Sequence, residues 1–347
     1  MSQWLLESAT AEFRRFANDW DRLNQTLYHA HPMFDSRFIG ALLCHFGTPD
    51  TLMAVHRTHG GMLLLEATRS NTWASFLPAQ LQAAPMMLPP QQYADLASLF
   101  RDLPGFPIQI DWLAQDPAYS PCPPATSMPE AYQQAALTMA ISIDGDFERY
   151  WSQRPKKLRN NIKRYLKRIG ETHQTPALQT FTATADMEEA LNRYSDLESA
   201  GWKGQNGTAI ERDNRQWHFY RDILQGFAKS SQARIYELQL DGRVVASRLA
   251  ISGGGMLLML KTTYDEAFRD LAVGRVLLYK LLEQEFSQRQ MQRIEFYTNA
   301  TPDQLEWATE SRAIEHVTTY RSSLYANSIM LARRLRNIVR KLRGEPS

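Results

Sequence analysis

The chain has 347 residues, of which 44% are hydrophobic and 22% are charged, and its formal net charge is +2. This length is enough for two domains with sizeable cores, and a nearly neutral chain gives no general reason to expect a nucleic acid as partner. The cysteines, Cys44 and Cys122, have no metal or redox spacing, which favours a reducing cytoplasm. We expect a cytoplasmic protein, peripheral to a membrane at most, because neither a signal-peptide pattern nor an apolar run of about 20 residues is present.

The first half of the chain is predicted to be a mixed α/β unit. Strand and helix patterns, separated by turn residues, occur at 51–57 (strand), 62–67 (strand), 73–77 (strand), 91–101 (helix) and 107–112 (strand). A proline-rich stretch at 115–130 then predicts an extended connection.

The second half begins with further alternation of strands and helices. The pattern predicts a strand at 136–143, a basic helix at 148–169, a strand at 178–182 and helices at 186–199 and 214–229.

Residues 234–298 carry the most informative pattern. Strands are predicted at 234–240, 243–251 and 256–262, and Asp241-Gly242 between the first two is typical of a type I′ hairpin turn. Gly274 precedes a helical run, and a strand at 293–298 follows it. A glycine at a strand-to-helix junction leaves backbone N–H groups free, and together with the helix dipole they favour an anion such as a pyrophosphate.

The two halves share this order of elements, with a similar distance from turn to last strand. We interpret this as a tandem pair of related units; the alternative is coincidence between two ordinary mixed domains. In the first half, Pro85 to Pro90 occupy the place of the glycine turn, and proline supplies no N–H donor. The first unit is therefore not expected to bind a cofactor.

The order of elements in 234–298 resembles the acyl-CoA-binding core of the GNAT acyltransferases. The segment from Glu198 to Ile210 is similar to the Glu-x-x-x-Trp-Lys-x-x-x-Gly-Thr-Ala signature of the CelD/BcsL-type acetyltransferases, a GNAT branch related to the FemAB fold. The resemblance covers roughly residues 139–325. It implies an α/β fold of tandem GNAT-like units, each a mixed, mostly antiparallel sheet flanked by helices. The expected division is a degenerate unit at 1–125, an acyl-CoA-binding unit at 126–325 and a basic amphipathic helix at 326–347.

The resemblance also implies where coenzyme A would bind. The turn at Val273 and Gly274 would hold its pyrophosphate, and Arg269 and Arg275 would pair with its phosphates unless they are ordinary surface arginines. Thioester chemistry needs an N–H donor where negative charge develops on the carbonyl oxygen. The expected donors are backbone groups in the stretch that comprises Leu260, Lys261 and Thr262.

The amine acceptor must be neutral to attack, which calls for a base. Glu198 and Glu295 are the candidate bases, and the alternative for Glu198 is an exposed helix residue. Tyr297 is a candidate proton donor to the leaving thiolate, as is Tyr320, although each could be a packing tyrosine.

Trp202 and Lys203 could hold the acceptor or the acyl chain, although Trp202 could instead anchor a loop. The sequence departs from the branch at the cofactor turn, which usually has Pro-Gly, and after Glu295, where the usual Tyr-Lys pair is absent.

Two segments are strongly basic. Residues 149–168 contain nine arginines or lysines and no acid, and 326–347 is a leucine-striped basic segment. Each could be a solvated helix face or could meet an anionic partner, such as a polysaccharide, a nucleotide-linked sugar, coenzyme A phosphates or an anionic membrane surface.

The sequence and the resemblance together predict direct transfer from acetyl-CoA or a longer acyl-CoA to an amine of an exopolysaccharide, as in cellulose biosynthesis, or of another cell-envelope precursor. A FemAB-like transferase that uses aminoacyl-tRNA is the second reading, although a nucleic acid partner is not favoured. The third is a non-catalytic subunit of a polysaccharide-synthesis complex. No metal is expected, because His56 and His59 lie close together without a third ligand.

Overall fold

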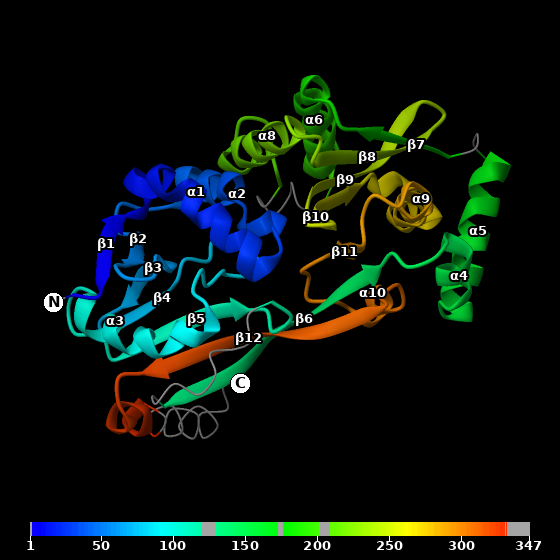
Figure 1. Ribbon diagram of the computed structural model, residues 1–347. Coiled ribbons are helices and arrows are strands. Elements are labelled where there is room, and N and C mark those ends of the chain that lie inside the picture. The colour runs from blue at the N-terminus through cyan, green and yellow to red at the C-terminus, as the bar shows by residue number, and fades with distance from the viewer. Residues whose placement is uncertain (1, 120–128, 173–175, 202–208, 330, 332–347) are drawn as a thin grey trace, which may run out of the picture. The chain divides into compact units, whose positions relative to one another are not determined.

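The computed structural model describes residues 2–119, 129–172, 176–201, 209–329 and 331 (Figure 1). The chain forms two compact units: unit 1 comprises 1–28, 46–136 and 313–347, and unit 2 comprises 29–45 and 137–312. Both units are therefore discontinuous in sequence, unlike the contiguous division at 125 and 325 that the sequence suggested. Among the described helices, none is both long and apolar enough to cross a bilayer.

Unit 1 is built on six strands in the order β1-β2-β3-β4-β5-β12. Neighbours are antiparallel except β4 and β5, which are parallel. The strands are β1 (Trp4–Ser8), β2 (Leu52–His56), β3 (Met62–Arg69), β4 (Thr72–Ser75), β5 (Gln109–Gln115) and β12 (Glu310–Tyr320), the last from Ala313 onward. The helices are α1 (Ala9–Tyr28), η2 (Pro90–Asp95) and α3 (Leu96–Asp102). Apolar residues of α3 and of the strands, among them Leu96, Leu99, Trp73 and Trp112, form its core.

Unit 2 has six strands in the order β7-β8-β9-β10-β11-β6. Here too, neighbours are antiparallel except one pair, β10 and β11. The strands are β6 (Glu130–Ser142, from Leu137 onward), β7 (Ala177–Phe181), β8 (Ala233–Leu240), β9 (Arg243–Gly253), β10 (Met256–Tyr264) and β11 (Arg293–Glu295). The helices are η1 (Pro32–Phe34), α2 (Ser36–Phe46, up to His45), α4 (Phe147–Ser152), α5 (Lys156–Thr172), α6 (Thr184–Ala200), α8 (Arg215–Ala228), η3 (Glu266–Leu271), α9 (Val273–Gln288) and α10 (Pro302–Leu305).

The two units repeat one pattern of strand order and direction. In each, four strands follow antiparallel to one another, a helical crossover leads to a parallel fifth strand, and a sixth strand adds antiparallel to the fifth. The prediction of a tandem α/β fold with mixed, mostly antiparallel sheets is confirmed.

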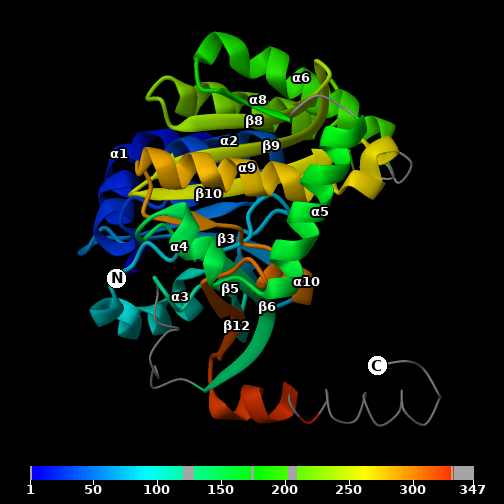
Figure 2. The same cartoon turned by 90° about the vertical axis from the view of Figure 1, so that its right-hand side faces the viewer.

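Helices cover both faces of the unit 2 strands. Side chains alternate between the faces of a strand, and neighbours on β8 reach different helices. Glu237 accepts a hydrogen bond from Arg193 of α6 at 2.9 Å, whereas Tyr236 donates one to Glu285 of α9 at 2.7 Å. Figure 2 shows α5 crossing α9 near one end of that helix, and the two helices pack against each other.

Glycines shape both hairpins of unit 2. Asp241 and Gly242 have φ of 49° and 78°, so the prediction of a turn with two positive φ angles is confirmed. The turn between β9 and β10 packs against the segment at 29–32. At Gly254, with φ of +54°, an added Cβ would lie 1.8 Å from the carbonyl oxygen of His29.

Two predicted elements differ in extent. The basic helix expected at 148–169 is divided into α4 and α5 at Pro155, because proline lacks an N–H group and restricts the residue before it. The last strand of the pattern ends at Glu295 rather than at 298, and Tyr297 has a positive φ of 43°. The basic C-terminal segment lies largely outside the described residues.

Candidate functional site

Unit 2 contains a cavity of about 450 Å³ where two strands separate. β10 pairs with β11 only from Met256 to Leu258, while β11 also pairs with β6. Beyond Leu258, β10 continues without β11 as its partner. Residues of β10, of the turn before α9 and of the segment after β11 line the cavity, including Thr262, Tyr264, Val273, Gly274, Phe296 and Trp307.

The turn before α9 is arranged to receive an anion. Ala272 adopts the left-handed conformation (φ 48°, ψ 44°) directly after η3, which is the backbone pattern of an anion-binding nest. The N–H groups of Arg275 and Val276 donate to the Ala272 carbonyl, and no side chain caps the helix. In the described structure, the N–H groups of Val273 and Gly274 have no backbone acceptor. Both residues line the cavity, so two donors and the positive helix end meet there.

Both arginines predicted beside the turn line the cavity as well. Arg269 is exposed, whereas Arg275 donates to Asp303 at 2.6 Å. These two guanidinium groups add positive charge to the helix N-terminus.

The middle of β10 contains an irregularity. The register with β9 shifts between Met259 and Lys261, so Leu260 has no residue opposite it on β9. This bulge follows the point at which β11 ceases to pair. Of the three predicted thioester-oxygen donors, Thr262 lines the cavity, and Leu260 and Lys261 do not appear among its lining residues.

Glu198 is buried, with 2% of its surface exposed, and both of its carboxylate oxygens accept hydrogen bonds. Tyr194 donates to one oxygen at 3.0 Å, and the backbone N–H of Ile210 donates to the other at 2.8 Å. Burial and the carboxylate raise the pKa of Tyr194 well above 10, so the tyrosine stays a donor. Glu198 does not line the cavity. Its contacts connect α6 to the start of the segment at 209–214.

Glu295 is fully buried on β11 between two arginines. Arg312 donates to it at 2.9 Å, and Arg293 also forms an ion pair with it. Burial raises the pKa of Glu295, and the two arginines oppose that rise. Glu295 is not among the residues that line the cavity, whereas its neighbour Phe296 is.

The remaining predicted residues lie in three places. Tyr297 is buried in unit 2, with its hydroxyl 3.1 Å from Nε2 of His31. Tyr320 belongs to β12 in unit 1. Trp202 and Lys203 lie outside the described residues.

Sequence reasoning missed Arg248, which also lines the cavity. It is a buried arginine on β9 whose Nε has no hydrogen-bond partner in the described structure. The signal was present, since Arg248 is the one charged residue in the otherwise apolar or small run from Val244 to Ile251.

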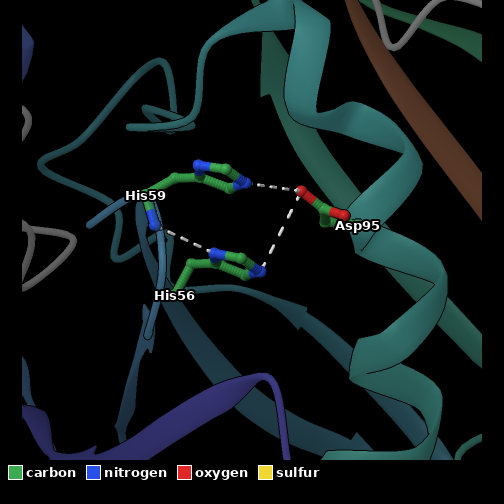
Figure 3. A group of neighbouring side chains, drawn as sticks. All are labelled: His56, His59 and Asp95. Atoms are coloured by element: carbon green, nitrogen blue, oxygen red, sulfur yellow. Dashed lines mark hydrogen bonds and ion pairs between the residues drawn. The ribbon is translucent and has the colours of Figure 1, made fainter.

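A second group of polar side chains lies in unit 1 (Figure 3). Nε2 of His56 and Nε2 of His59 lie 3.9 and 3.8 Å from one carboxylate oxygen of Asp95. The prediction that the two histidines lack a third potential ligand was therefore wrong, because the fold brings η2 beside the hairpin.

The same group is poorly arranged for a metal ion. The two imidazole rings are stacked, 4.8 Å apart and inclined by 4°, so their lone pairs run parallel rather than converge. The backbone N–H of His59 donates to Nδ1 of His56, so this nitrogen carries no proton. The proton of the neutral His56 ring is then on Nε2, the atom that would have to bind a metal ion. We assign these residues no function.

Comparison with known proteins agrees with the fold. Residues 156–305 match the family model of the acetyltransferase (GNAT) domain. No curated protein sequence matches the chain.

Three solved structures resemble the chain at low sequence identity. The C-terminal domain of a candidate lysylphosphatidylglycerol synthetase from Agrobacterium fabrum is 9% identical, with a TM-score of 0.58 over 93% of this chain and 96% of that one. FemX is 10% identical, with a TM-score of 0.59 over 87% and 95%. L-PGS from Bacillus licheniformis is 10% identical, with a TM-score of 0.51 over 91% and 95%. At such identities the likeness concerns the fold alone. Residues 156–305 thus match the acetyltransferase (GNAT) domain, and they lie within a tandem arrangement of two similar units.

Proposed function

We propose that unit 2 transfers an acyl group from an acyl-CoA, acetyl-CoA or a longer one, directly to an amine in a ternary complex. The observation that carries this proposal is the turn before α9, where Val273 and Gly274, whose N–H groups have no backbone acceptor in the described structure, line a cavity together with Arg269 and Arg275. A pyrophosphate is the anion that such a helix N-terminus favours. Coenzyme A is the donor that combines a pyrophosphate with a transferable acyl group.

The separation of β10 from β11 supports the chemical half of the proposal. A thioester that enters between the strands would meet the β10 backbone just beyond Leu258, where pairing with β11 ends. The bulge at Leu260 frees this stretch from a regular ladder. A backbone N–H from this stretch would stabilise the oxygen on which negative charge develops during attack by the amine.

The acceptor is proposed from the sequence resemblance to the CelD/BcsL branch. That resemblance favours an amine on an exopolysaccharide or another cell-envelope precursor, modified at the cytoplasmic face of the membrane. The basic segment at 326–347 is the part of the chain suited to hold the enzyme at an anionic surface or at a synthase complex.

An aminoacyl-tRNA-dependent transfer is the second candidate function. It is favoured by the fold likeness to FemX and by the basic surface of α5, which packs against η3 and α9. The apolar face of α5 is buried through Leu158, Ile162 and Ile169. Its exposed residues include Lys156, Lys157, Lys163, Arg164, Lys167 and Arg168.

The deciding experiment is calorimetric titration of acetyl-CoA and longer acyl-CoAs into the wild type, Gly274→Glu and Gly274→Ala. An added Cβ at Gly274 would meet only the ring of Tyr264, at the ordinary contact distances of 3.6 Å to Cδ1 and 3.9 Å to Cγ. The alanine variant therefore controls for the steric change, and the glutamate adds a negative charge beside the phosphates. We expect micromolar binding by the wild type and the alanine variant, and a loss of at least about tenfold with glutamate, equivalent to about 1.4 kcal/mol.

If none of the acyl-CoAs binds, the proposal fails. Binding of tRNA that weakens steeply with salt would then support the second candidate. If neither ligand binds, a non-catalytic role in a polysaccharide-synthesis complex remains.

A further inference from the structure

Arg248 is a buried cation that the described protein does not neutralise. Its side chain is on β9, only 8% of the residue is exposed, and its Nε is buried without a hydrogen-bond partner. Within the described ranges, the guanidinium has no hydrogen bond or ion pair. Its favourable neighbours are uncharged at neutral pH: the ring of Phe296, whose centroid lies 5.6 Å from Cζ, and the side chains of Tyr194 and Tyr236. Burial lowers the pKa of Arg248 to about 10, so the group is still charged at neutral pH.

A second buried arginine of unit 2 shows how the fold treats such a group when it is structural. Arg234, on the neighbouring strand β8, is 5% exposed. It donates to Ser252 at 3.2 Å and to Gln290 at 2.8 Å, and its Nε lies 3.9 Å from Glu285. Arg248 has no such partners. Because a buried charge without a partner is unfavourable, its presence indicates a ligand that supplies the missing anion.

The location of Arg248 fits that reading. Tyr236, Arg248 and Thr262 are successive partners across β8, β9 and β10, so their side chains share one face of the sheet. Arg248 and Thr262 both line the cavity where β10 leaves β11. Among the three arginines around the cavity, Arg269 is exposed and Arg275 is paired with Asp303, which leaves Arg248 as the buried one.

We propose that Arg248 binds a carboxylate on one of the two reacting molecules in this cavity. A planar carboxylate can accept two parallel hydrogen bonds from a guanidinium, and its single charge balances that of one buried arginine. The phosphates of the donor have the turn at Val273 and Gly274 as their proposed site. The carboxylate therefore belongs either to an acidic acyl group, such as succinyl, or to the amine acceptor. This inference rests on the proposed function, since it names the substrate class of the same cavity.

The test compares ligands that differ only in the carboxylate. In the first arm, acetyl-CoA and succinyl-CoA are titrated into the wild type, Arg248→Met and Arg248→Lys. If the carboxylate is on the acyl group, the wild type binds succinyl-CoA at least about tenfold more tightly than acetyl-CoA. Arg248→Met abolishes this preference. Arg248→Lys keeps part of it, because lysine retains the positive charge but cannot donate two parallel hydrogen bonds to one carboxylate.

The second arm places the carboxylate on the acceptor. Glycine, glutamate, lysine and muramic acid are each titrated against their carboxamides into the CoA-saturated protein. A preference for at least one acid over its amide, lost in Arg248→Met, identifies the acceptor as the source. If no acyl-CoA binds, which is failure of the proposed function, this arm is run on the protein alone and still decides the inference.

Thermal unfolding of the ligand-free variants separates a binding role from a structural one. Arg248→Met should leave the melting temperature unchanged or raise it, because it removes an unpaired buried charge. The matched control, Arg234→Met, breaks satisfied hydrogen bonds and should lower it without altering either ligand preference. The inference is overturned if Arg248→Met lowers the melting temperature as much as Arg234→Met does. It is also overturned if neither arm shows an Arg248-dependent preference for a carboxylate, or if CoA and both acyl-CoAs weaken equally, which would put the guanidinium on the CoA phosphates.

Discussion

Replacing Glu198 should reveal whether this carboxylate organises the fold or serves as a base. Its two oxygens accept from the Tyr194 hydroxyl and the Ile210 N–H, and it does not line the cavity. We therefore expect Glu198→Gln to act on stability first. In the variant, the single amide oxygen can still accept from Tyr194. The NH₂ group must then face the N–H of Ile210, so two hydrogen-bond donors meet and neither has an acceptor.

The size of the effect follows from these two bonds. A hydrogen bond to a charged group contributes about 1.5–3 kcal/mol, and a buried donor left without an acceptor costs about 1–3 kcal/mol. Glu198→Gln loses one charged bond and weakens the other, so we expect a destabilisation of about 2–4 kcal/mol. Glu198→Ala loses both and should cost about 3–5 kcal/mol, with the cavity adding to it.

Hydrogen exchange is the assay that isolates this contact, since a chain with two units need not unfold in one transition. The peptide that contains the Ile210 amide should exchange faster by a factor that corresponds to the lost free energy, while peptides of unit 1 are unchanged. The control is Glu188→Gln, since Glu188 is an exposed residue of the same helix whose carboxylate accepts from Gln225 at 3.3 Å. This variant should change neither the exchange of the Ile210 amide nor that of the unit 1 peptides.

The structural reading of Glu198 would be refuted by the opposite pattern. If Glu198→Gln keeps the protection of the Ile210 amide but abolishes acyl transfer, and the wild-type rate falls at low pH as a carboxylate takes up a proton, Glu198 acts as the base.

Two further predictions concern stability. Gly254→Ala should destabilise unit 2 by more than about 2 kcal/mol, because a positive φ costs about 1–2 kcal/mol and the new Cβ would meet the His29 carbonyl. Gly242→Ala, also at positive φ but in open space, should cost only the backbone term, and equal losses in urea unfolding would contradict this reasoning. In the folded protein, burial raises the pKa of Glu295 above 4.5, so the Glu295 carboxyl stabilises the fold by an amount that depends on pH. This stabilisation is fully present below pH 4.5 and is lost as the pH rises through the pKa of the folded state. The unfolding free energy of the wild type relative to Glu295→Gln should therefore fall as the pH rises above 4.5, and a difference that is constant with pH would exclude the effect.

Local signals made much of unit 2 predictable. Asp241-Gly242 predicts a hairpin because few residue pairs accept two positive φ angles, and the turn at Gly274 is marked by the change from strand to helix periodicity. The sequence placed both correctly, since each depends on residues close to one another in the chain. The charge pattern, in contrast, predicts one long basic helix at 148–169, whereas the structure divides it at Pro155, because proline restricts the residue before it.

Long-range pairing lay beyond the sequence. β12 joins β5 although about 200 residues separate them, and its mixed sequence has no clean alternation to mark it as a strand. The discontinuous units follow from this pairing, because the chain returns to unit 1 only after unit 2 is complete.

The sequence by itself determined the repeated order of elements and the position of the turn before α9, because periodicity, turn residues and proline act through neighbouring backbone. Only the tertiary structure decided what the charged side chains do. It gave Glu198 two buried donors, enclosed Glu295 between two arginines and, among the described residues, left Arg248 beside the cavity without a hydrogen-bond acceptor for its Nε. The physical reason is that burial and pairing of a charge depend on groups from distant segments, and the identity of one residue does not specify those groups.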